Sequence, residues 1–240
     1  MKRISVVVPA HNEERSIPRL LETLHDVFSH LRYELELLVV DDTSTDKTLG
    51  VVQHLASTDA RVKYLSFATN AGQQAATSAR LRYDTGDAVI IMDADLQHPP
   101  SIIPALIQKW EEGSMLVFGV RVTHTHESFL RGLASGMANA LINIRHRSGL
   151  PGNTADFSLI DRSVVEEFKK LPAREVMTRY RLAGLSTKRA YVVFPVTLRT
   201  EGESKYTYKK LLRLFWKSFV GKRITGTLYE VGSSNIARYE

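Results

Sequence analysis

Short apolar runs alternate with segments of helical period through the first half of the chain. The runs cover residues 4–8, 35–40, 62–67 and 88–92. Each run is followed by polar residues. Between the first two runs, apolar residues recur at helical spacing from Ile17 to Leu31, which predicts a helix with Ser16 as its N-cap. Strands and helices that alternate in this way predict an α/β fold with a parallel, doubly wound sheet.

The remaining pattern predicts more elements of both kinds. Further strands are predicted at residues 115–120, 155–160 and 191–198. Further helices are predicted around residues 49–55, 127–144, 162–171 and 176–185, with an alanine-rich helix that ends near Tyr83. Residues 207–223 mix Leu, Phe and Trp with Lys and Arg and predict an amphipathic helix. That helix either lies on anionic lipid or packs on the domain with a solvated basic face.

The central strand at 88–92 ends in two carboxylates one residue apart, Asp93 and Asp95. Two like charges this close repel each other, and desolvation at the edge of a core adds to the cost, so a cation has to neutralise them. Mg²⁺ or Mn²⁺ suits the pair, because each takes one or two carboxylates and completes its shell with water and substrate phosphates. Gln97 can add a carbonyl oxygen. The alternative is that Asp95 or Gln97 caps the helix that the following Pro-Pro pair begins.

Four polar loops are expected at one edge of the sheet. They follow the strands at residues 9–13, 41–42, 70–73 and 93–97. In parallel sheets, ligands bind beyond the carboxyl ends of the strands, where these loops lie. A single acid such as Glu14 or Asp46 is better explained as a helix cap or a solvated turn. Three acidic loops at one edge, however, indicate a bound cation.

Composition and charge narrow the classes of partner. The 240 residues carry a formal net charge of +6, which indicates an anionic partner: a nucleotide, a lipid headgroup or a nucleic acid. The absence of cysteine excludes disulfides, thiolate metal sites and cysteine nucleophiles, and it suits a reducing compartment. The opening residues MKRISVVVPAHNEE predict a first strand instead of a signal peptide, and no apolar stretch is long enough to span a bilayer.

Six motifs add a specific resemblance. They are VVVPAHNEE at 6–14, VVDDTSTDKT at 39–48, DAVIIMDADLQHPP at 87–100, FGVR at 118–121, NTADFSLIDRSVV at 153–165 and GESKY at 202–206. Together they resemble the family-2 glycosyltransferases of GT-A fold, in the branch that includes dolichyl-phosphate mannose synthases and bacterial undecaprenyl-phosphate glycosyltransferases. The resemblance implies a Rossmann-like, mostly parallel sheet flanked by helices. It also implies a GT-A catalytic domain at residues 1–206 and a C-terminal amphipathic segment at 207–240.

The resemblance implies a role for each matching polar position. The nucleotide-binding set is Pro9, Asn12, Glu13, Asp42, Gln73, Asp93, Ala94 and Asp95. The set that holds Mg²⁺ or Mn²⁺ on the donor diphosphate is Asp93, Asp95 and Gln97. The set that grips the acceptor phosphate is Arg121, Arg131, Ser135 and Lys205. Asp156 matches the family's proposed catalytic acid residue, and Arg121 and Arg131 complete the predicted catalytic set.

Three positions depart from the family pattern. Thr43 replaces the usual glycine of a tight turn, so we expect that turn to be altered. Ala71 replaces a bulky or aromatic residue, and His98 replaces Asp or Asn. The family branch also usually continues into transmembrane helices that this chain lacks. Whether those helices are absent by nature or were removed stays open.

The reaction implied is metal-dependent, inverting transfer of a hexose from a GDP- or UDP-linked sugar to a polyprenyl phosphate. A phosphate acceptor is already largely anionic near pH 7, because its second pKa is about 6. We therefore expect Asp156 to orient the acceptor more than to remove a proton. No residue suggests a covalent nucleophile, which favours a single in-line displacement. The sugar, the nucleobase, the exact lipid and the oligomeric state stay open.

Two other functions fit parts of the sequence. A soluble transferase that acts on a glycan or a protein is favoured by the missing membrane helices. A non-catalytic nucleotide-binding or nucleic-acid-binding module is suggested only by the basic charge, and no nucleic-acid motif accompanies it, so we expect no nucleic acid partner. We expect a cytoplasmic location, with peripheral contact at the cytoplasmic face of a membrane.

Overall fold

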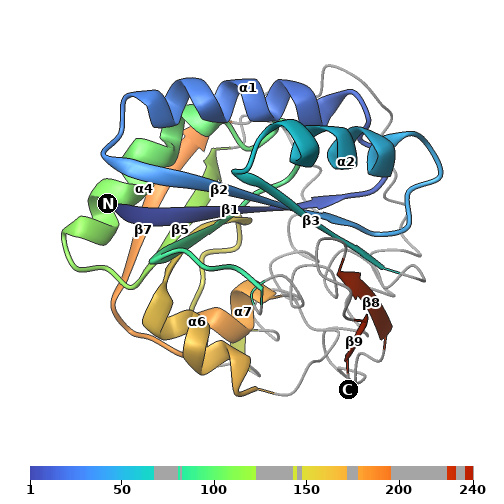
Figure 1. Cartoon of the computed structure of the whole chain (residues 1–240). Helices are drawn as coiled ribbons and strands as arrows, with labels where there is room; N and C mark the ends of the chain where they lie inside the picture. The colour runs from blue at the N-terminus through green and yellow to red at the C-terminus, as the bar shows by residue number, and fades with distance from the viewer. Residues whose placement is uncertain are drawn as a thin grey trace, which may run out of the picture.

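Nine strands in the described part of the chain form one mixed sheet with helices on both faces, as the computed structural model shows (Figure 1). The structure describes residues 1–67, 81, 83–122, 143–144, 148–171 and 178–195, and the backbone of residues 226–230 and 236–239. The strands are β1 (Lys2–Ala10), β2 (Tyr33–Asp41), β3 (Val62–Phe67), β4 (Ala88–Ile91), β5 (Leu116–Val122), β6 (Thr154–Asp161), β7 (Arg189–Pro195), β8 (Gly226–Glu230) and β9 (Ile236–Tyr239). The helices are α1 (Ser16–Ser29), α2 (Thr48–Thr58), η1 (Pro100–Ile102), α4 (Ile103–Glu111), α6 (Arg162–Lys169) and α7 (Thr178–Ala183).

The strands lie in the order β7-β5-β6-β4-β1-β2-β3-β8-β9. β1 pairs in parallel with both β2 and β4, and β2 pairs in parallel with β3. β6 lies antiparallel between β4 and β5, and β5 pairs in parallel with β7. β8 and β9 extend the other edge as antiparallel strands. The predicted α/β fold with a mostly parallel sheet is therefore confirmed.

The reversed strand β6 begins where its neighbours end. Thr154 at the start of β6 lies opposite Val120 near the end of β5, and Ser158 lies opposite Ile91 at the end of β4. The first residues of β6 therefore join the ends of β1, β2, β4 and β5 at one edge. This carboxyl edge is where sheets of this kind bind their ligands.

Burial on both faces explains the continuous apolar run of β4. Ile90 and Met92 pack in the core cluster that includes residues of α1, α2 and α4. Val89 and Ile91 pack with Phe168 in the cluster on the side of α6 and α7. Figure 1 shows α1 and α2 on one side of the strands and α6 and α7 on the other. Because neither face of β4 meets solvent, its sequence does not alternate between apolar and polar residues.

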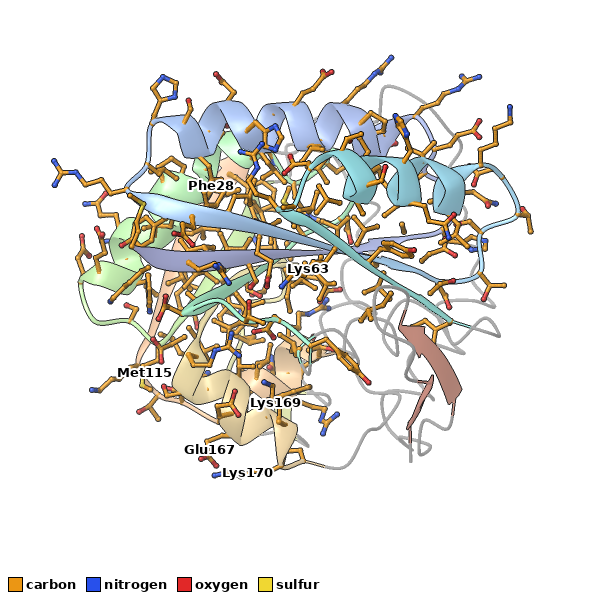
Figure 2. All side chains as sticks on the ribbon, viewed as in Figure 1. Phe28, Lys63, Met115, Glu167, Lys169 and Lys170 are labelled. Atoms are coloured by element: carbon orange, nitrogen blue, oxygen red, sulfur yellow. The ribbon has the colours of Figure 1, made fainter. Side chains whose placement is uncertain are left out.

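The predicted core face of α1 is confirmed. Its buried residues are Ile17, Leu20, Leu21, Leu24 and Phe28. Phe28 lies between the helix and the sheet, whereas Glu167 of α6 and Lys170, which follows that helix, point outward (Figure 2). The prediction of Ser16 as N-cap is wrong: Arg15 is the N-cap, and no side chain caps the helix. Ser16 is already the first residue of the helix, and its hydroxyl donates to Glu13 Oε2 at 2.8 Å.

Some predicted elements fall outside the described residues. They are the alanine-rich helix before Tyr83, nearly all of the helix at 127–144, and the amphipathic helix at 207–223. Among the residues that the structure does describe, no helix combines the length and the apolar character needed to cross a membrane.

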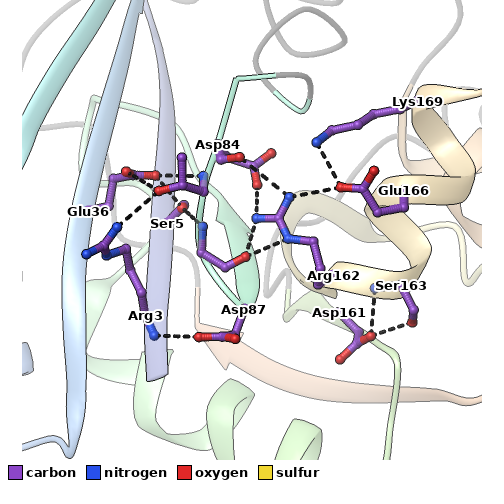
Figure 3. A network of polar contacts seen from close by, with 12 residues as sticks. Arg3, Ser5, Glu36, Asp84, Asp87, Asp161, Arg162, Ser163, Glu166 and Lys169 are labelled. Atoms are coloured by element: carbon purple, nitrogen blue, oxygen red, sulfur yellow. Dashed lines mark hydrogen bonds and ion pairs between the residues drawn. The ribbon is translucent and has the colours of Figure 1, made fainter. Parts of the chain in front are cut away.

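A polar network lies at the opposite, amino-terminal edge of the sheet (Figure 3). The guanidinium of Arg162 donates to the backbone carbonyl of Gly86 and to Asp84 Oδ1. Asp84 is buried, and its Oδ2 accepts no hydrogen bond within the described part of the chain. Burial therefore raises the pKa of Asp84 to about 6, although the charge of Arg162 opposes the shift. Nearby, Ser5 Oγ accepts from the Gly86 amide at 2.8 Å and donates to Glu36 Oε1 at 2.6 Å.

Candidate active site

The loops after β1, β2 and β4, the end of β5 and the start of β6 meet at the carboxyl edge. Backbone hydrogen bonds fix the first three of these segments to one another. The amide of Asp42 donates to the carbonyl of Ala10 at 2.8 Å, and the amide of Met92 donates to the carbonyl of Val7 at 3.2 Å. The loops after β2 and β4 therefore flank the end of β1.

Asn12 ties the loop after β1 to the loop after β2. Its φ of 61° lies in the left-handed region, which asparagine tolerates. Its side-chain Oδ1 accepts from the backbone amide of Thr45 at 2.8 Å, and its backbone amide donates to Ser44 Oγ at 2.9 Å. Asp46 accepts from the amide of Thr48 at the start of α2, at 2.9 Å, which fits its interpretation as a structural turn residue. The backbone of the loops is thus held by side chains of the loops themselves.

Thr43 adopts a backbone conformation that favours glycine. Its φ is 58°, which is strained for a β-branched residue. Its hydroxyl donates to the carbonyl of Phe67 at the end of β3, at 3.2 Å. The neighbouring Asp42 is buried, with 5% of its surface exposed. The threonine therefore keeps a left-handed turn at the cost of local strain and gains a contact that glycine lacks.

Asp93 and Asp95 lie directly after β4, at the carboxyl edge of the sheet. Asp95 Oδ1 accepts from the amide of Gln97 at 3.1 Å, which closes a turn within the loop. The following helical segment begins at Pro100, with Pro99 as its N-cap and no side-chain cap. The alternative in which Asp95 or Gln97 caps this helix is therefore wrong, because the chain turns again before the helix starts.

The side chains of this loop fit a hard divalent cation. About a quarter of the Asp93 side chain is exposed (26%), and Asp95 is also partly exposed. No group of three His, Cys, Asp or Glu side chains suited to a metal occurs among the residues that the structure describes. Two carboxylates that leave room for substrate oxygens are what Mg²⁺ and Mn²⁺ use beside phosphates. Asp93, Asp95 and Gln97 carry carboxylate and amide oxygens in this loop.

His98 lies buried beside the acidic loop, with none of its side chain exposed. Its ring stacks on Phe157 with a centroid distance of 5.1 Å and meets Phe194 edge-on at 6.0 Å. The amide of Asp93 donates to Nδ1 at 3.0 Å, and Nη2 of Arg121 lies 2.9 Å from Nε2. Burial, and then the charge of Arg121, lower the pKa of His98 to about 4, so the ring is neutral at pH 7. The sequence marked His98 only as a departure from the family pattern.

Asp156 near the start of β6 forms an ion pair with Arg179 of α7, with 2.9 Å between Oδ1 and Nη1. Burial alone would raise the pKa of Asp156, but the charges of Arg179 and Arg121 outweigh it and hold that pKa below its usual range. An aspartate with a lowered pKa is a weak proton acceptor, so the geometry favours an orienting role. Sequence reasoning missed Arg179, for which the only signal was an arginine inside the mostly apolar run of a predicted helix.

The remaining predicted site residues divide into two groups. Those that lie at the carboxyl edge, where their contact with a nucleotide stays a prediction, are Pro9, Asn12, Glu13, Asp42 and Ala94. Those that fall outside the described residues are Gln73, Arg131, Ser135 and Lys205. The structure thus brings Asp93, Asp95, Arg121 and Asp156 together around His98.

Solved structures define the fold class. Glucosyl-3-phosphoglycerate synthase from Mycobacterium tuberculosis, in complex with Mn²⁺, UDP and phosphoglyceric acid, aligns with a TM-score of 0.64 and 23% identity, over 91% of this chain and 76% of that one. Mannosyl-3-phosphoglycerate synthase from Rubrobacter xylanophilus aligns with a TM-score of 0.65 and 19% identity, over 91% and 72% of the two chains. At these identities the likeness concerns the fold alone, which is the GT-A fold.

Sequence comparison shows the family. Residues 5–169 match the model of Glycosyl transferase family 2, and the chain belongs to this family. The bactoprenol glucosyl transferase of Shigella phage SfX is 35% identical over 212 residues, which are 88% of this chain and 70% of that protein. The uncharacterized glycosyltransferase YkcC of Bacillus subtilis is 35% identical over 210 residues, which are 88% of this chain. The chain spans 65% of the length of YkcC.

Proposed function

We propose that this chain catalyses metal-dependent, inverting transfer of a hexose from a UDP- or GDP-linked sugar to a polyprenyl phosphate. The observation that carries the proposal is that Asp93, the first residue of the acidic pair, and Arg121 contact opposite nitrogens of one buried residue, His98. A cation site suited to a diphosphate therefore lies beside a guanidinium suited to a second phosphate. The bactoprenol glucosyl transferase of Shigella phage SfX, at 35% identity, and the prophage bactoprenol glucosyl transferase homolog of Escherichia coli, at 34% identity, support a lipid phosphate as acceptor.

The donor half of the site is formed by the loops after β1, β2 and β4. Asp93, Asp95 and Gln97 would hold Mg²⁺ or Mn²⁺. When bound, the cation neutralises the negative charge that develops on the diphosphate leaving group. Structures of the same fold that contain UDP with Mn²⁺ or Mg²⁺ support this choice of cation. The residues proposed to surround the nucleotide are Pro9, Asn12, Glu13, Asp42, Gln73 and Ala94.

The acceptor half is formed around Arg121, together with Arg131, Ser135 and Lys205. These side chains are proposed to bind the phosphate and aim one of its oxygens at the anomeric carbon. That oxygen carries negative charge near pH 7, so the step needs no strong general base. Asp156 stays ionised beside Arg179 and orients the acceptor side of the site. A single displacement by the phosphate oxygen inverts the anomeric centre.

Peripheral contact with a membrane is part of the proposal, because a polyprenyl phosphate resides in lipid. Residues 207–223 combine Trp216 and Phe219 with lysines and arginines, a composition that suits an anionic lipid surface. The proposed place of action is the cytoplasmic face of that membrane, which agrees with a chain without cysteine.

A transfer assay with the purified chain tests the proposal. Radiolabelled UDP-glucose or GDP-mannose is offered with Mn²⁺ to vesicles that contain undecaprenyl phosphate, to vesicles with undecaprenol, and to a soluble oligosaccharide. We expect transfer to the lipid phosphate alone, and co-sedimentation of the chain with the vesicles. EDTA abolishes transfer, and Asp93→Asn or Asp95→Asn lowers kcat roughly 100-fold or more.

The matched control is Asp26→Asn, which makes the same carboxylate-to-amide change on the exposed side of α1 and retains activity. Transfer to the oligosaccharide without transfer to the lipid phosphate would establish the alternative acceptor class. Undiminished transfer in EDTA would refute the cation site.

A further inference from the structure

His98 faces two hydrogen-bond donors with one acceptor atom. The amide of Asp93 lies 3.0 Å from Nδ1, and Nη2 of Arg121 lies 2.9 Å from Nε2. A neutral imidazole carries one N–H and one acceptor nitrogen, and a guanidinium can only donate. The two contacts therefore cannot both be hydrogen bonds in the same tautomer. A proton on Nε2 lets the ring accept from Asp93, and a proton on Nδ1 lets it accept from Arg121.

The surroundings hold the ring in place while its proton can occupy either nitrogen. Stacking on Phe157 and edge contact with Phe194 fix the ring plane in a fully buried position. A doubly protonated ring would have no acceptor for either the Asp93 amide or the Arg121 guanidinium, so the contacts fit a neutral ring. When the proton is on Nδ1, it faces Asp93 Oδ2 at 3.6 Å, which partly replaces the lost contact with the amide. The Nδ1–H form thus has an acceptor near one nitrogen and a donor at the other, whereas the Nε2–H form places its N–H against the guanidinium of Arg121, which is also a donor.

We propose that His98 is a positioning residue that couples Arg121 to the acidic loop through its tautomer. A phosphate bound by Arg121 takes over as acceptor for the guanidinium, and His98 then settles with its proton on Nε2 and accepts from the Asp93 amide. One proton leaves Nδ1 as Nε2 gains one, so the charge of the ring does not change. Occupation of the acceptor side thereby tightens the loop that holds the cation. The coupling between the acceptor side and the cation site rests on the proposed function, whereas the dependence of the His98 tautomer on Arg121 does not.

The tautomer is measured in the substrate-free chain by long-range ¹H–¹⁵N correlation of labelled histidine. Loss of one set of signals in His98→Asn assigns His98 among the eight histidines. We expect nitrogen shifts between those of the two pure tautomers in the wild type, and a shift to the pure Nε2–H form in Arg121→Met. Addition of farnesyl phosphate to the wild type moves the signals in the same direction. Identical tautomers in the wild type and Arg121→Met would overturn the inference.

The coupling is measured by calorimetry as the affinity for Mn²⁺ with UDP or GDP, with and without farnesyl phosphate. Asn places its amide at the position of Nδ1 and Gln at that of Nε2, so each retains one contact of His98 only. We expect farnesyl phosphate to raise the affinity of the wild type about fivefold to tenfold. In His98→Asn we expect the affinity for Mn²⁺ with the nucleotide to be high even without farnesyl phosphate, and in His98→Gln we expect it to be low. Farnesyl phosphate should change the affinity of neither variant.

His30→Asn, at an exposed position after α1, is the control and keeps the response of the wild type. A response that persists in both His98 variants, or that is missing in the wild type, would overturn the coupling. If the chain fails to transfer sugar to a lipid phosphate but Arg121→Met still shifts the tautomer, the proposed function falls and the assignment of His98 as a tautomeric bridge stands.

Discussion

Burial of Asp84 predicts that the chain loses stability as the pH rises from about 4 to 6. The carboxylate is buried at the amino-terminal edge of the sheet, where its Oδ1 meets Arg162 and its Oδ2 accepts nothing from the described residues. Desolvation disfavours the charged form, so its pKa in the native chain is about 6, against 3.8 for an ordinary aspartate. The native state therefore binds this proton more tightly than the unfolded state does.

The magnitude follows from the size of the shift. A difference of about 2 pH units, at roughly 1.4 kcal/mol for each unit, corresponds to about 3 kcal/mol. Below pH 3.8 the group is protonated in both states and causes no loss of stability. Between the two pKa values the loss grows, and above pH 6 it stays at its full size. Of the total, about 2 kcal/mol develops between pH 4.5 and 7.5.

Urea denaturation followed by tryptophan fluorescence from pH 4.5 to 7.5 measures the effect. Asp84→Asn removes the titrating group. The difference between the free energies of unfolding of the variant and the wild type should therefore shift by about 2 kcal/mol in favour of the variant from pH 4.5 to 7.5. Comparison with the variant cancels groups such as Glu36, whose pKa is lowered to about 2 because hydrogen bonds from Lys63, Ser5 and Thr85 outweigh its burial. Asp26→Asn is the control and should run parallel to the wild type. Parallel curves for the wild type and Asp84→Asn would refute the reasoning.

Two further predictions concern other sites. Gly86→Ala should lower the free energy of unfolding by about 2 kcal/mol or more, because a Cβ there would lie 2.6 Å from the backbone nitrogen of Ser5. Gly50→Ala in α2, where a Cβ meets nothing within 4 Å, should raise the free energy of unfolding by about 1 kcal/mol. Urea denaturation of both variants measures these changes, and equal changes in Gly86→Ala and Gly50→Ala would contradict the close packing around Gly86. Asp156→Asn should cost about 2 kcal/mol at pH 7, because it removes the negative charge that lies 2.9 Å from Nη1 of Arg179, and the loss should shrink as the pH falls through the lowered pKa of Asp156. If Asp156→Asn has the same free energy of unfolding as the wild type at pH 7, the ion pair between Asp156 and Arg179 does not contribute to stability.

Local pattern predicted most of the elements to within a few residues, but not the strands β8 and β9 near the end of the chain. The apolar run of β4 and the helical period of α1 describe which faces are buried, and burial depends on side chains that are close in sequence. The position of Asp93 and Asp95 at the carboxyl edge followed from the parallel direction of the early strands. Their motif, with those around it, also indicated the family, which the comparisons confirmed.

Local pattern could not predict contacts between residues that are far apart in the sequence. Asp84 and Arg162 are 78 positions apart, and His98 and Arg121 are 23 apart. The apolar period of β6 reads the same in either direction, so the sequence did not show that this strand is reversed and begins at the carboxyl edge.

The sequence by itself determined most of the strands and helices and the acidic pair, because spacing along the chain decides which side chains share a face. Only the tertiary structure decided which charge meets which. The reversed β6 brings Asp156 to the site, and α7 supplies Arg179 to it. The packing of β5, β6 and β7 beside the loop after β4 places a neutral His98 between Asp93 and Arg121. Those partners depend on strand order and direction, which arise when the whole sheet assembles.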